Sequence, residues 1–277
     1  MVIGVVSPGA MGSALGASLA RSGHRVVATL EGRSARTREL AARTPFDLLG
    51  DVGEVAAQSD IVLSVVPPGQ AAAVAEAVAG TPLLVDLNAV SPMTVERVSQ
   101  ALAGSGTELV DGAISGPPPW RPGTRVYLSG ARAREVAALG FDGVDVRVVG
   151  DEVGVASAIK MSTASVYKGT ALLLAQALVT AQRNGVLDVV RNDLEASFPD
   201  LMEGIERYLA SSASKAHRYV GEMHEISATQ GAAGQPAAVF EAIATAYEEM
   251  SRSDAARMTP EEAAAVESLA GVLRRLG

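Results

Sequence analysis

The sequence contains no cysteine, so disulfide bonds, thiolate nucleophiles and cysteine-ligated zinc sites are excluded. Aromatic residues are also scarce at 4% of the chain, although 48% of the residues are hydrophobic. The core is therefore expected to be aliphatic and built from alanine, valine and leucine side chains. The lack of cysteine suits a reducing compartment, and we expect a cytoplasmic protein.

Basic residues are also fewer than acidic ones. The sequence has 23 lysine and arginine residues and 31 acidic residues, which gives a formal net charge of −8. An acidic chain is repelled by polyanions, so we expect neither nucleic acid nor an anionic membrane surface as a partner. No apolar run reaches the roughly 18 residues that suggest a transmembrane helix. The apolar N-terminal stretch lacks a basic start, which favours a strand and turn over a signal peptide.

What the first half does contain is a regular alternation of short apolar runs and helix-forming stretches. The predicted strands are residues 2–6, 26–30, 61–66, 83–86, 108–110, 125–128 and 144–149. The predicted helices between them are residues 34–42, 69–78, 92–102 and 132–139. Strands that alternate with helices are typical of parallel βαβ units. We therefore predict a doubly wound, Rossmann-like α/β sheet.

The pattern changes after Gly150. A stretch without proline, from about Glu152 to Asn184, predicts one helix of roughly 50 Å at 1.5 Å per residue. Only helices are expected beyond it, at residues 187–197, 199–210, 212–229, 235–252 and 260–275. We predict two domains, residues 1–150 and an all-α domain of residues 151–277. So long a helix at a domain boundary predicts a homodimer through the helical domain, and burial within one subunit is the alternative.

The first predicted strand leads into a turn with the sequence Ser7-Pro8-Gly9-Ala10-Met11-Gly12 and then into a helix. Backbone N–H groups and the helix dipole at such a turn favour a pyrophosphate. The usual dinucleotide fingerprint has three glycines. Ser7 replaces the first, whereas Gly9 and Gly12 keep the second and third. We predict that all six residues bind a cofactor, with an ordinary strand–turn–helix as the alternative.

The loop after the second predicted strand contains Glu31, Arg33 and Ser34. In a dinucleotide-binding fold, an acid here binds the 2′-hydroxyl of NAD, and an arginine accepts the 2′-phosphate of NADP. Arg33 and Ser34 favour NADP as the cofactor, with NAD as the alternative through Glu31. A solvated charged loop, in which Glu31 pairs with a neighbouring arginine, is a further interpretation.

Two further strand ends are predicted to line the ligand crevice, because the carboxyl ends of parallel strands face it. Val66 and Pro67 follow one of these strands and are expected beside the nicotinamide. Asn88 follows the next strand. Its amide is predicted to hydrogen-bond the cofactor or, alternatively, to cap the helix that begins near Pro92.

Four motifs, at residues 7–12, 64–67, 111–117 and 154–160, occur in an order that resembles the 6-phosphogluconate/β-hydroxyacid dehydrogenase superfamily. Residues 116–124 and 160–169 resemble more narrowly the branch whose helical C-terminal half is a domain of unknown function. The resemblance covers nearly the whole chain. It implies an NAD(P)-dependent oxidoreductase that interconverts a hydroxyl and a carbonyl group on a small, acidic substrate. It further implies that Lys160 is the general acid/base and that the substrate lies between the two domains.

The substrate-binding residues that this resemblance implies lie in two segments. Ser115 and Gly116 are expected to hold a substrate carboxylate, while Pro117 lacks the N–H group of the glycine that the family has there. Trp120 is predicted as an apolar wall or as a packing anchor. Thr163 stands where the superfamily often has asparagine. These departures leave a catalytically inactive nucleotide-binding scaffold open as an alternative. Imine reduction is a further alternative, because the resemblance extends to helical-domain dehydrogenases that reduce C=N bonds.

Two more residues follow on the same predicted helix. Tyr167 lies near the Lys160 face, seven residues on, and is assigned to the substrate site. Lys168 is predicted to bind an anionic substrate or, alternatively, to be a surface lysine. His217 and His224 share a helix face, but they lack the His-x-x-x-His spacing of a zinc helix. We therefore expect no metal.

Overall fold

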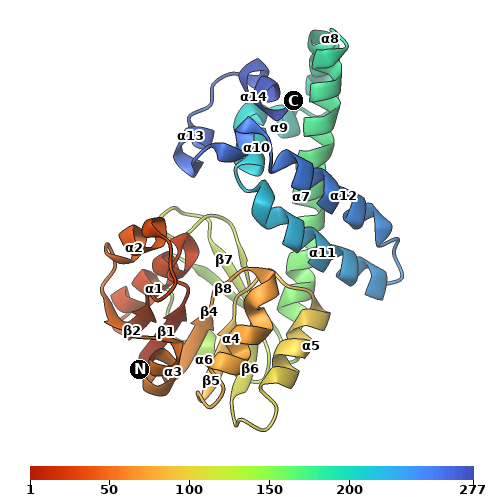
Figure 1. Cartoon of the computed structure of the whole chain (residues 1–277). Coiled ribbons are helices and arrows are strands. Elements are labelled where there is room, and N and C mark those ends of the chain that lie inside the picture. The colour runs from red at the N-terminus through yellow and green to blue at the C-terminus, as the bar shows by residue number, and fades with distance from the viewer. The chain divides into compact units, whose positions relative to one another are not determined.

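The computed structural model describes every residue of the chain in two compact units, Met1–Met161 and Ser162–Gly277 (Figure 1). We call them the sheet unit and the helical unit. The predicted fold class is confirmed, because a sheet with helices on both faces is followed by a helix-rich region. None of the helices is both long and apolar enough to cross a membrane.

The sheet unit contains one eight-stranded sheet in the order β3-β2-β1-β4-β5-β6-β7-β8. The strands are β1 (Val2–Val6), β2 (Arg25–Thr29), β3 (Phe46–Leu49), β4 (Ile61–Ser64), β5 (Leu83–Asp86), β6 (Glu108–Ser115), β7 (Arg125–Ser129) and β8 (Asp145–Gly150). The strands from β3 to β6 are parallel, whereas β7 runs antiparallel to β6 and β8 runs parallel to β7. The predicted parallel βαβ pattern therefore holds for the first six strands.

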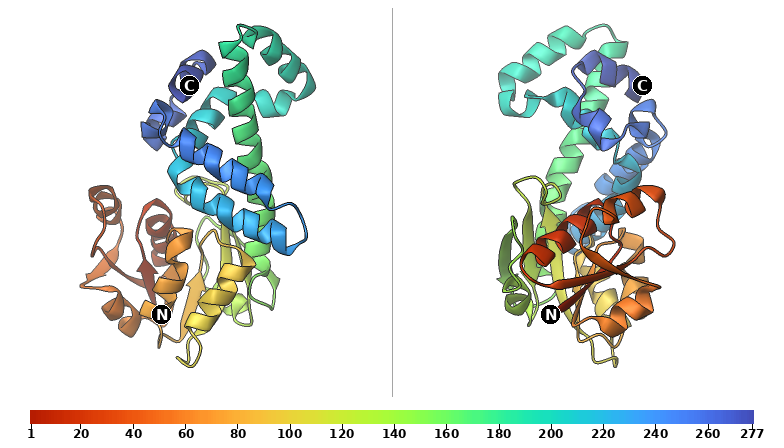
Figure 2. Two further views of the ribbon diagram at one scale, coloured as in Figure 1. Left: turned by 45° about the vertical axis from the view of Figure 1, so that its right-hand side comes forward. Right: turned by 90° about the vertical axis from the view of Figure 1, so that its left-hand side faces the viewer.

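Helices cover both faces of this sheet (Figure 2). They are α1 (Ala10–Arg21), α2 (Ala35–Ala41), α3 (Val52–Gln58), α4 (Ala71–Ala77), α5 (Pro92–Ala101) and α6 (Ala133–Ala137), with a short 3-10 turn, η1 (Pro68–Gln70), before α4. One aliphatic core contains Leu15 of α1 and Val136 of α6, and a second contains Ala75 of α4 and Val98 of α5. Because side chains alternate along a strand, β1 contributes Ile3 to the first core and Val6 to the second.

The helical unit is built around α7 (Val155–Arg183), which begins in the sheet unit. It continues with α8 (Leu187–Ser197), α9 (Pro199–Met202), α10 (Ile205–Ala213), α11 (Ala216–Ala232), α12 (Ala238–Met250), η2 (Asp254–Arg257), α13 (Pro260–Ala264) and α14 (Leu269–Leu276). Leu178 of α7, Leu209 of α10 and Leu273 of α14 share its core. The α11 and α12 helices lie side by side (Figure 2).

Several predicted elements differ from the structure. Strand β3 and helix α3 were not predicted, because β3 is a four-residue edge strand whose Leu48 is half-exposed and carries little apolar pattern. The predicted helix 199–210 is broken at Gly204, which has a φ of 68°. The predicted helix 260–275 is also two helices, since the Ser268 hydroxyl caps a new one by accepting from the Gly271 N–H at 3.3 Å.

Candidate functional site

The predicted cofactor residues lie beyond the carboxyl ends of the parallel strands. Strands β1, β4, β5 and β6 all end there, at Val6, Ser64, Asp86 and Ser115. The strand order reverses at β1, which lies between β2 and β4. Ligands of doubly wound sheets bind at this kind of switch point, outside the carboxyl ends of the strands.

The turn between β1 and α1 has the backbone of a dinucleotide loop although its first glycine is replaced. Ser7 has a φ of 70° and is the only residue other than glycine with a positive φ, a conformation that costs on the order of 1 kcal/mol. A Cβ atom on Gly12 would lie 2.4 Å from the Ser7 carbonyl oxygen, so only glycine allows α1 to approach β1 this closely. A Cβ on Gly9 would meet nothing within 4 Å.

The start of α1 is left open as well. Gly9 is its N-cap, and no side chain caps the helix. Pro8 is buried, and its carbonyl accepts a hydrogen bond from the Ser13 hydroxyl at 2.6 Å, whereas Ala10 is exposed and Met11 half-buried. Space above Gly9 and an uncapped helix N-terminus fit the pyrophosphate of a dinucleotide.

The loop after β2 presents one unsatisfied donor. The Nε atom of Arg33 is buried without a hydrogen-bond partner, and such orphaned donors call for an explanation. Ser34 uses its hydroxyl to cap α2, accepting from the Thr37 N–H at 3.3 Å. Glu31 is exposed. Arg33 is therefore the residue of this loop that best fits an added anionic group.

Asn88 joins the ends of two strands rather than capping a helix. Its Oδ1 accepts from the Val66 N–H at 2.6 Å, and its Nδ2 donates to the Ser64 hydroxyl at 2.9 Å. The predicted alternative of a helix cap is wrong, because Ser91 caps α5. The buried amide of Asn88 thus fixes the backbone at Val66, one residue before the exposed Pro67.

Lys160 lies in the second turn of α7, where its ammonium group donates a hydrogen bond to the Ile114 carbonyl at 2.8 Å. Burial lowers the pKa of Lys160 below the ordinary lysine value. Ser115 and Gly116 directly follow Ile114 at the end of β6, so the lysine and the predicted carboxylate-binding residues lie at one strand end. This arrangement can transfer a proton beside a bound acid.

The loop after Gly116 folds back on itself. Gly116 has a φ of 99°, and a Cβ atom there would lie 2.4 Å from the Gly123 carbonyl oxygen. The Pro117 carbonyl accepts from the Thr124 hydroxyl at 2.6 Å, which closes the loop. Trp120 is 52% exposed, so the predicted packing anchor is wrong and the apolar wall stays a prediction.

Asp111 was missed by the sequence interpretation as a residue with a specific role. It is fully buried on β6, and its carboxylate accepts hydrogen bonds from β7 and from the start of α7. Its signal was present in the sequence, since an acid within a predicted buried strand needs several hydrogen-bond donors. The donors themselves are far away along the chain and could not be identified.

The remaining predicted residues belong to the helical unit. Thr163 is exposed, and so is Tyr167, whose carbonyl accepts from the Tyr208 hydroxyl. The alternative that Lys168 is a surface lysine is wrong, because its side chain is 11% exposed and its ammonium group is bonded to the Glu222 carboxylate. The same ammonium lies 4.3 Å from the centroid of the Tyr219 ring.

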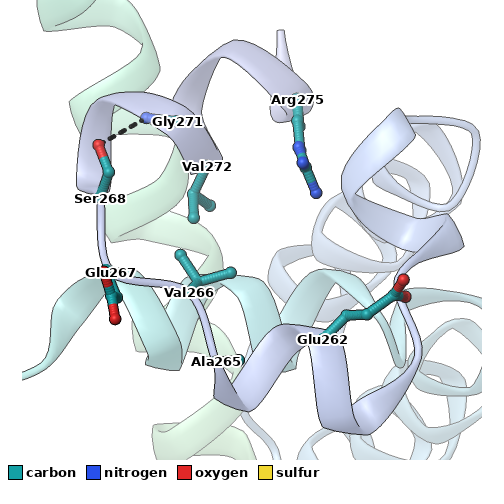
Figure 3. Close-up of a pocket in the computed structure, with 8 residues that line it drawn as sticks. All are labelled: Glu262, Ala265, Val266, Glu267, Ser268, Gly271, Val272 and Arg275. Atoms are coloured by element: carbon teal, nitrogen blue, oxygen red, sulfur yellow. Dashed lines mark hydrogen bonds between the residues drawn. The ribbon is translucent and has the colours of Figure 1, made fainter.

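The helical unit has two further features, an ion pair and a pocket. His224 pairs with Glu241 at 2.9 Å on the surface, and no three histidine or acidic side chains gather as a metal site would require. A pocket of about 450 Å³ lies between α13 and α14, where the Val266 and Val272 side chains point toward one another (Figure 3). None of the predicted site residues lines that pocket.

Comparison with known proteins covers both halves of the chain. The profile of the NAD binding domain of 6-phosphogluconate dehydrogenase matches residues 2–138. That of a domain of unknown function (DUF1932) matches residues 181–250. An uncharacterized 28.5 kDa protein, from the 7S RNA 5′ region of Methanothermus fervidus, is 30% identical over 198 residues, or 69% of this chain and 76% of that protein.

Solved structures extend the likeness to the whole chain. A protein of unknown function, described as structurally similar to 3-hydroxyacid dehydrogenases, is 31% identical with a TM-score of 0.68, over 91% of this chain and 97% of that one. Two more distant structures share the fold. They are 3-hydroxyisobutyrate dehydrogenase from Salmonella typhimurium (18% identity, TM-score 0.69, 99% of both chains) and an imine reductase from Myxococcus stipitatus in complex with NADP+ (21%, 0.59, 90% of this chain and 94% of that one).

Proposed function

Because this chain belongs to the 6-phosphogluconate/β-hydroxyacid dehydrogenase superfamily, we propose that it is an NADP(H)-preferring oxidoreductase. It interconverts a hydroxyl and a carbonyl group on a small substrate that carries an acidic group, and Lys160 is its general acid/base. The observation that carries this proposal is the half-buried Lys160, whose ammonium group donates a hydrogen bond to the Ile114 carbonyl at the end of β6, beside Ser115 and Gly116.

Proton transfer is the task of Lys160 in this proposal. The bound dinucleotide supplies or accepts the hydride. During oxidation, the neutral Lys160 amine takes the proton of the substrate hydroxyl, and during reduction the ammonium returns a proton to the carbonyl oxygen. Burial lowers the pKa of this lysine, so its neutral form is available at lower pH than for an exposed lysine.

Substrate orientation falls to the end of β6. The Ser115 hydroxyl and the Gly116 N–H group donate to the substrate carboxylate. Pro117 has no N–H group, so this cradle has one donor fewer than a glycine would provide. A weaker grip on the carboxylate favours a substrate that the apolar surface of the half-exposed Trp120 also contacts.

Cofactor preference rests on Arg33. The guanidinium group of the half-buried Arg33, whose Nε has no hydrogen-bond partner, would donate to the 2′-phosphate that distinguishes NADP from NAD. The open backbone at Gly9 holds the pyrophosphate, and Val66 and Pro67 line the nicotinamide side. The imine reductase from Myxococcus stipitatus that shares this fold was solved with NADP+ and, as a variant, with NAD+, so the preference rests on Arg33 and not on the fold.

Imine reduction is a second candidate reaction. Thr163 stands in place of an amide side chain, and the fold is shared with imine reductases. The chemistry differs only in the group that accepts the hydride, so a substrate screen that includes imines separates the two reactions. A chain that binds the cofactor but turns over neither class would be a nucleotide-binding scaffold.

Calorimetric titration with NADPH and, separately, with NADH is the experiment that tests this function. We expect clear binding of both, with NADPH much tighter. Tighter binding of NADH would move the assignment from Arg33 to Glu31, and binding of neither would contradict the oxidoreductase. An absorbance screen of NADPH oxidation against carbonyl compounds and imines then identifies the substrate class.

We also propose a homodimer formed through α7. This helix has three highly exposed large hydrophobic side chains within two turns, Val166 (66% exposed), Tyr167 (65%) and Leu173 (62%). A second copy of the chain would bury this surface. Light scattering should give twice the chain mass for the native protein and the single-chain mass for V166E/L173E. A monomeric native protein would contradict the proposal.

A further inference from the structure

The carboxylate of Asp111 lies at the first turn of α7 and is fully buried. Its Oδ2 accepts from the Gly154 N–H at 2.9 Å, from the Ser157 N–H at 3.0 Å and from the Ser129 hydroxyl at 3.1 Å. Its Oδ1 accepts from the Ser157 hydroxyl at 2.6 Å. The Ser129 oxygen in turn accepts from the Ala156 N–H at 3.0 Å. Two strands thereby bind the beginning of one helix.

These contacts make Asp111 a helix cap that is supplied from a distant strand. The first N–H groups of a helix have no partner within the helix, and a carboxylate satisfies them and matches the helix dipole. Most caps belong to the residue just before the helix. Here the cap comes from β6, 46 positions before Ser157, so it determines where α7 begins relative to the sheet.

The same strand and the same helix meet a second time at the proposed catalytic residue. Ile114 lies three residues after Asp111 on β6, and Lys160 lies three residues after Ser157 on α7. Three residues advance a strand by about 10 Å and a helix by about 4.5 Å, and the long lysine side chain covers the difference. The two contacts therefore share one register.

We infer that Asp111 is a positioning residue, which holds α7 in the register that brings the Lys160 ammonium to the Ile114 carbonyl. This inference rests on the proposed role of Lys160. Asp111 itself transfers no proton, because its carboxylate is enclosed by the α7 N–H groups and two hydroxyl groups. Its effect on the reaction passes through the place and hydration of the Lys160 side chain.

The test is an NMR titration of lysine side chains labelled with carbon-13 at Cε in the full-length protein. The chain has only three lysines, Lys160, Lys168 and Lys215, so three signals suffice and K168R and K215R assign them. The variants are D111A, which removes the acceptor, and D111N, which keeps an oxygen in the Oδ2 position. In D111N the Ser157 hydroxyl turns to accept from the new amide.

We expect the pKa of Lys160 to rise by about 1 pH unit in D111A, because the loosened helix start lets water reach the ammonium. D111N should titrate like the native protein. The matched control is D51A, which removes another aspartate cap in the sheet unit, on α3, where Asp51 accepts from the Glu54 N–H at 2.8 Å. It should leave the Lys160 signal unchanged.

An unchanged Lys160 titration in folded D111A would overturn the inference. An equal upward shift in D111N and D111A would also overturn it, because D111N keeps the oxygen that caps α7. A downward shift in both variants would overturn it as well, because it would assign the effect to the lost charge of the carboxylate and not to position. If D111A does not fold, S129A and S157A each remove one part of the cap. A smaller upward shift in both supports the inference, and no shift in either contradicts it.

Calorimetry with NADPH separates this inference from the proposed function. Every cap variant should keep the native NADPH affinity, since the loop from Ser7 to Gly12 lies on another strand. A native chain that binds no NADPH yet shows the D111A shift would lose the proposed function and keep the positioning role. A native chain that binds NADPH, with no shift of the Lys160 pKa in D111A, would keep the proposed function and lose the positioning role of Asp111.

Discussion

Lys160 and Lys168 lie eight residues apart on the same helix, yet the structure holds their ammonium groups in different ways. Lys160 donates to the neutral Ile114 carbonyl, and burial lowers its pKa. Lys168 pairs with the Glu222 carboxylate and lies over the Tyr219 ring. A carbonyl stabilises a cation less than a carboxylate does. The comparison suggests that Lys160 exchanges a proton, whereas the Lys168–Glu222 pair joins α7 to α11.

The largest effect is expected at Lys160. K160Q should lower kcat/KM about 10²- to 10⁴-fold, because it removes the group that moves the proton. Affinity for NADPH and thermal stability should change little. Steady-state kinetics with the carbonyl substrate found in the screen measure the loss. Full activity in K160Q would mean that another group transfers the proton, and Lys160 would then not differ from Lys168 in function.

At Lys168 the expected loss is of stability. K168M should destabilise the helical unit by about 3 kcal/mol, since it leaves the largely buried Glu222 charge without its partner. Near-ultraviolet circular dichroism follows the tyrosines, four of which lie in this unit, while fluorescence of Trp120, the single tryptophan, follows the sheet unit. The double variant K168M/E222L should recover part of the loss. Native stability in K168M would mean that the pair contributes nothing.

Arg33 is expected to act on cofactor binding and not on proton transfer, so its substitution should change affinity where K160Q changes the rate. R33A should weaken NADPH binding about 10- to 100-fold, the worth of a charged hydrogen bond, and leave NADH binding unchanged. The control is R43A, which removes an equal charge at the exposed Arg43, just after α2. It should bind NADPH nearly as the native chain does. Calorimetric titration of both variants with NADPH and with NADH measures these affinities. Equal losses in both variants would point to general electrostatics and not to a specific contact.

The smallest effect is expected at Ser7, where the cofactor loop itself stores strain. S7G should stabilise the chain by about 0.5–1 kcal/mol, because glycine adopts the positive φ without a steric cost. S7A keeps the Cβ atom and should bring no gain. Thermal unfolding followed by Trp120 fluorescence compares the two. A gain in S7A as large as in S7G would mean that the strained backbone is not the cause.

Much of the sheet unit could be predicted from local pattern. Strands β1 and β5 were predicted with their observed bounds, because each is a short apolar run that ends at a polar residue or turn. Lys160 could be named only through a family resemblance, since no local pattern marks it. The edge strand β3 escaped prediction because one of its sides is unpaired and its residues face solvent.

The contacts that give the site residues their roles could not be predicted, because their partners are remote in sequence. Glu222 lies 54 positions after Lys168, and Ser157 lies 46 positions after Asp111. Asn88 had two predicted roles, and the structure gives its amide a third one, between Val66 and Ser64. Spacing along a chain specifies helix faces and strand ends, whereas pairing between them depends on how the elements pack.

The pH dependence of alcohol oxidation, in the native protein and in K160Q, tests the central claim most directly. Oxidation needs the neutral amine, so the native rate should rise with pH and level off above a pKa below the ordinary lysine value. The reverse reduction needs the ammonium and should fall over the same range. The account predicts that K160Q loses both limbs. An unchanged pH profile in K160Q would contradict it.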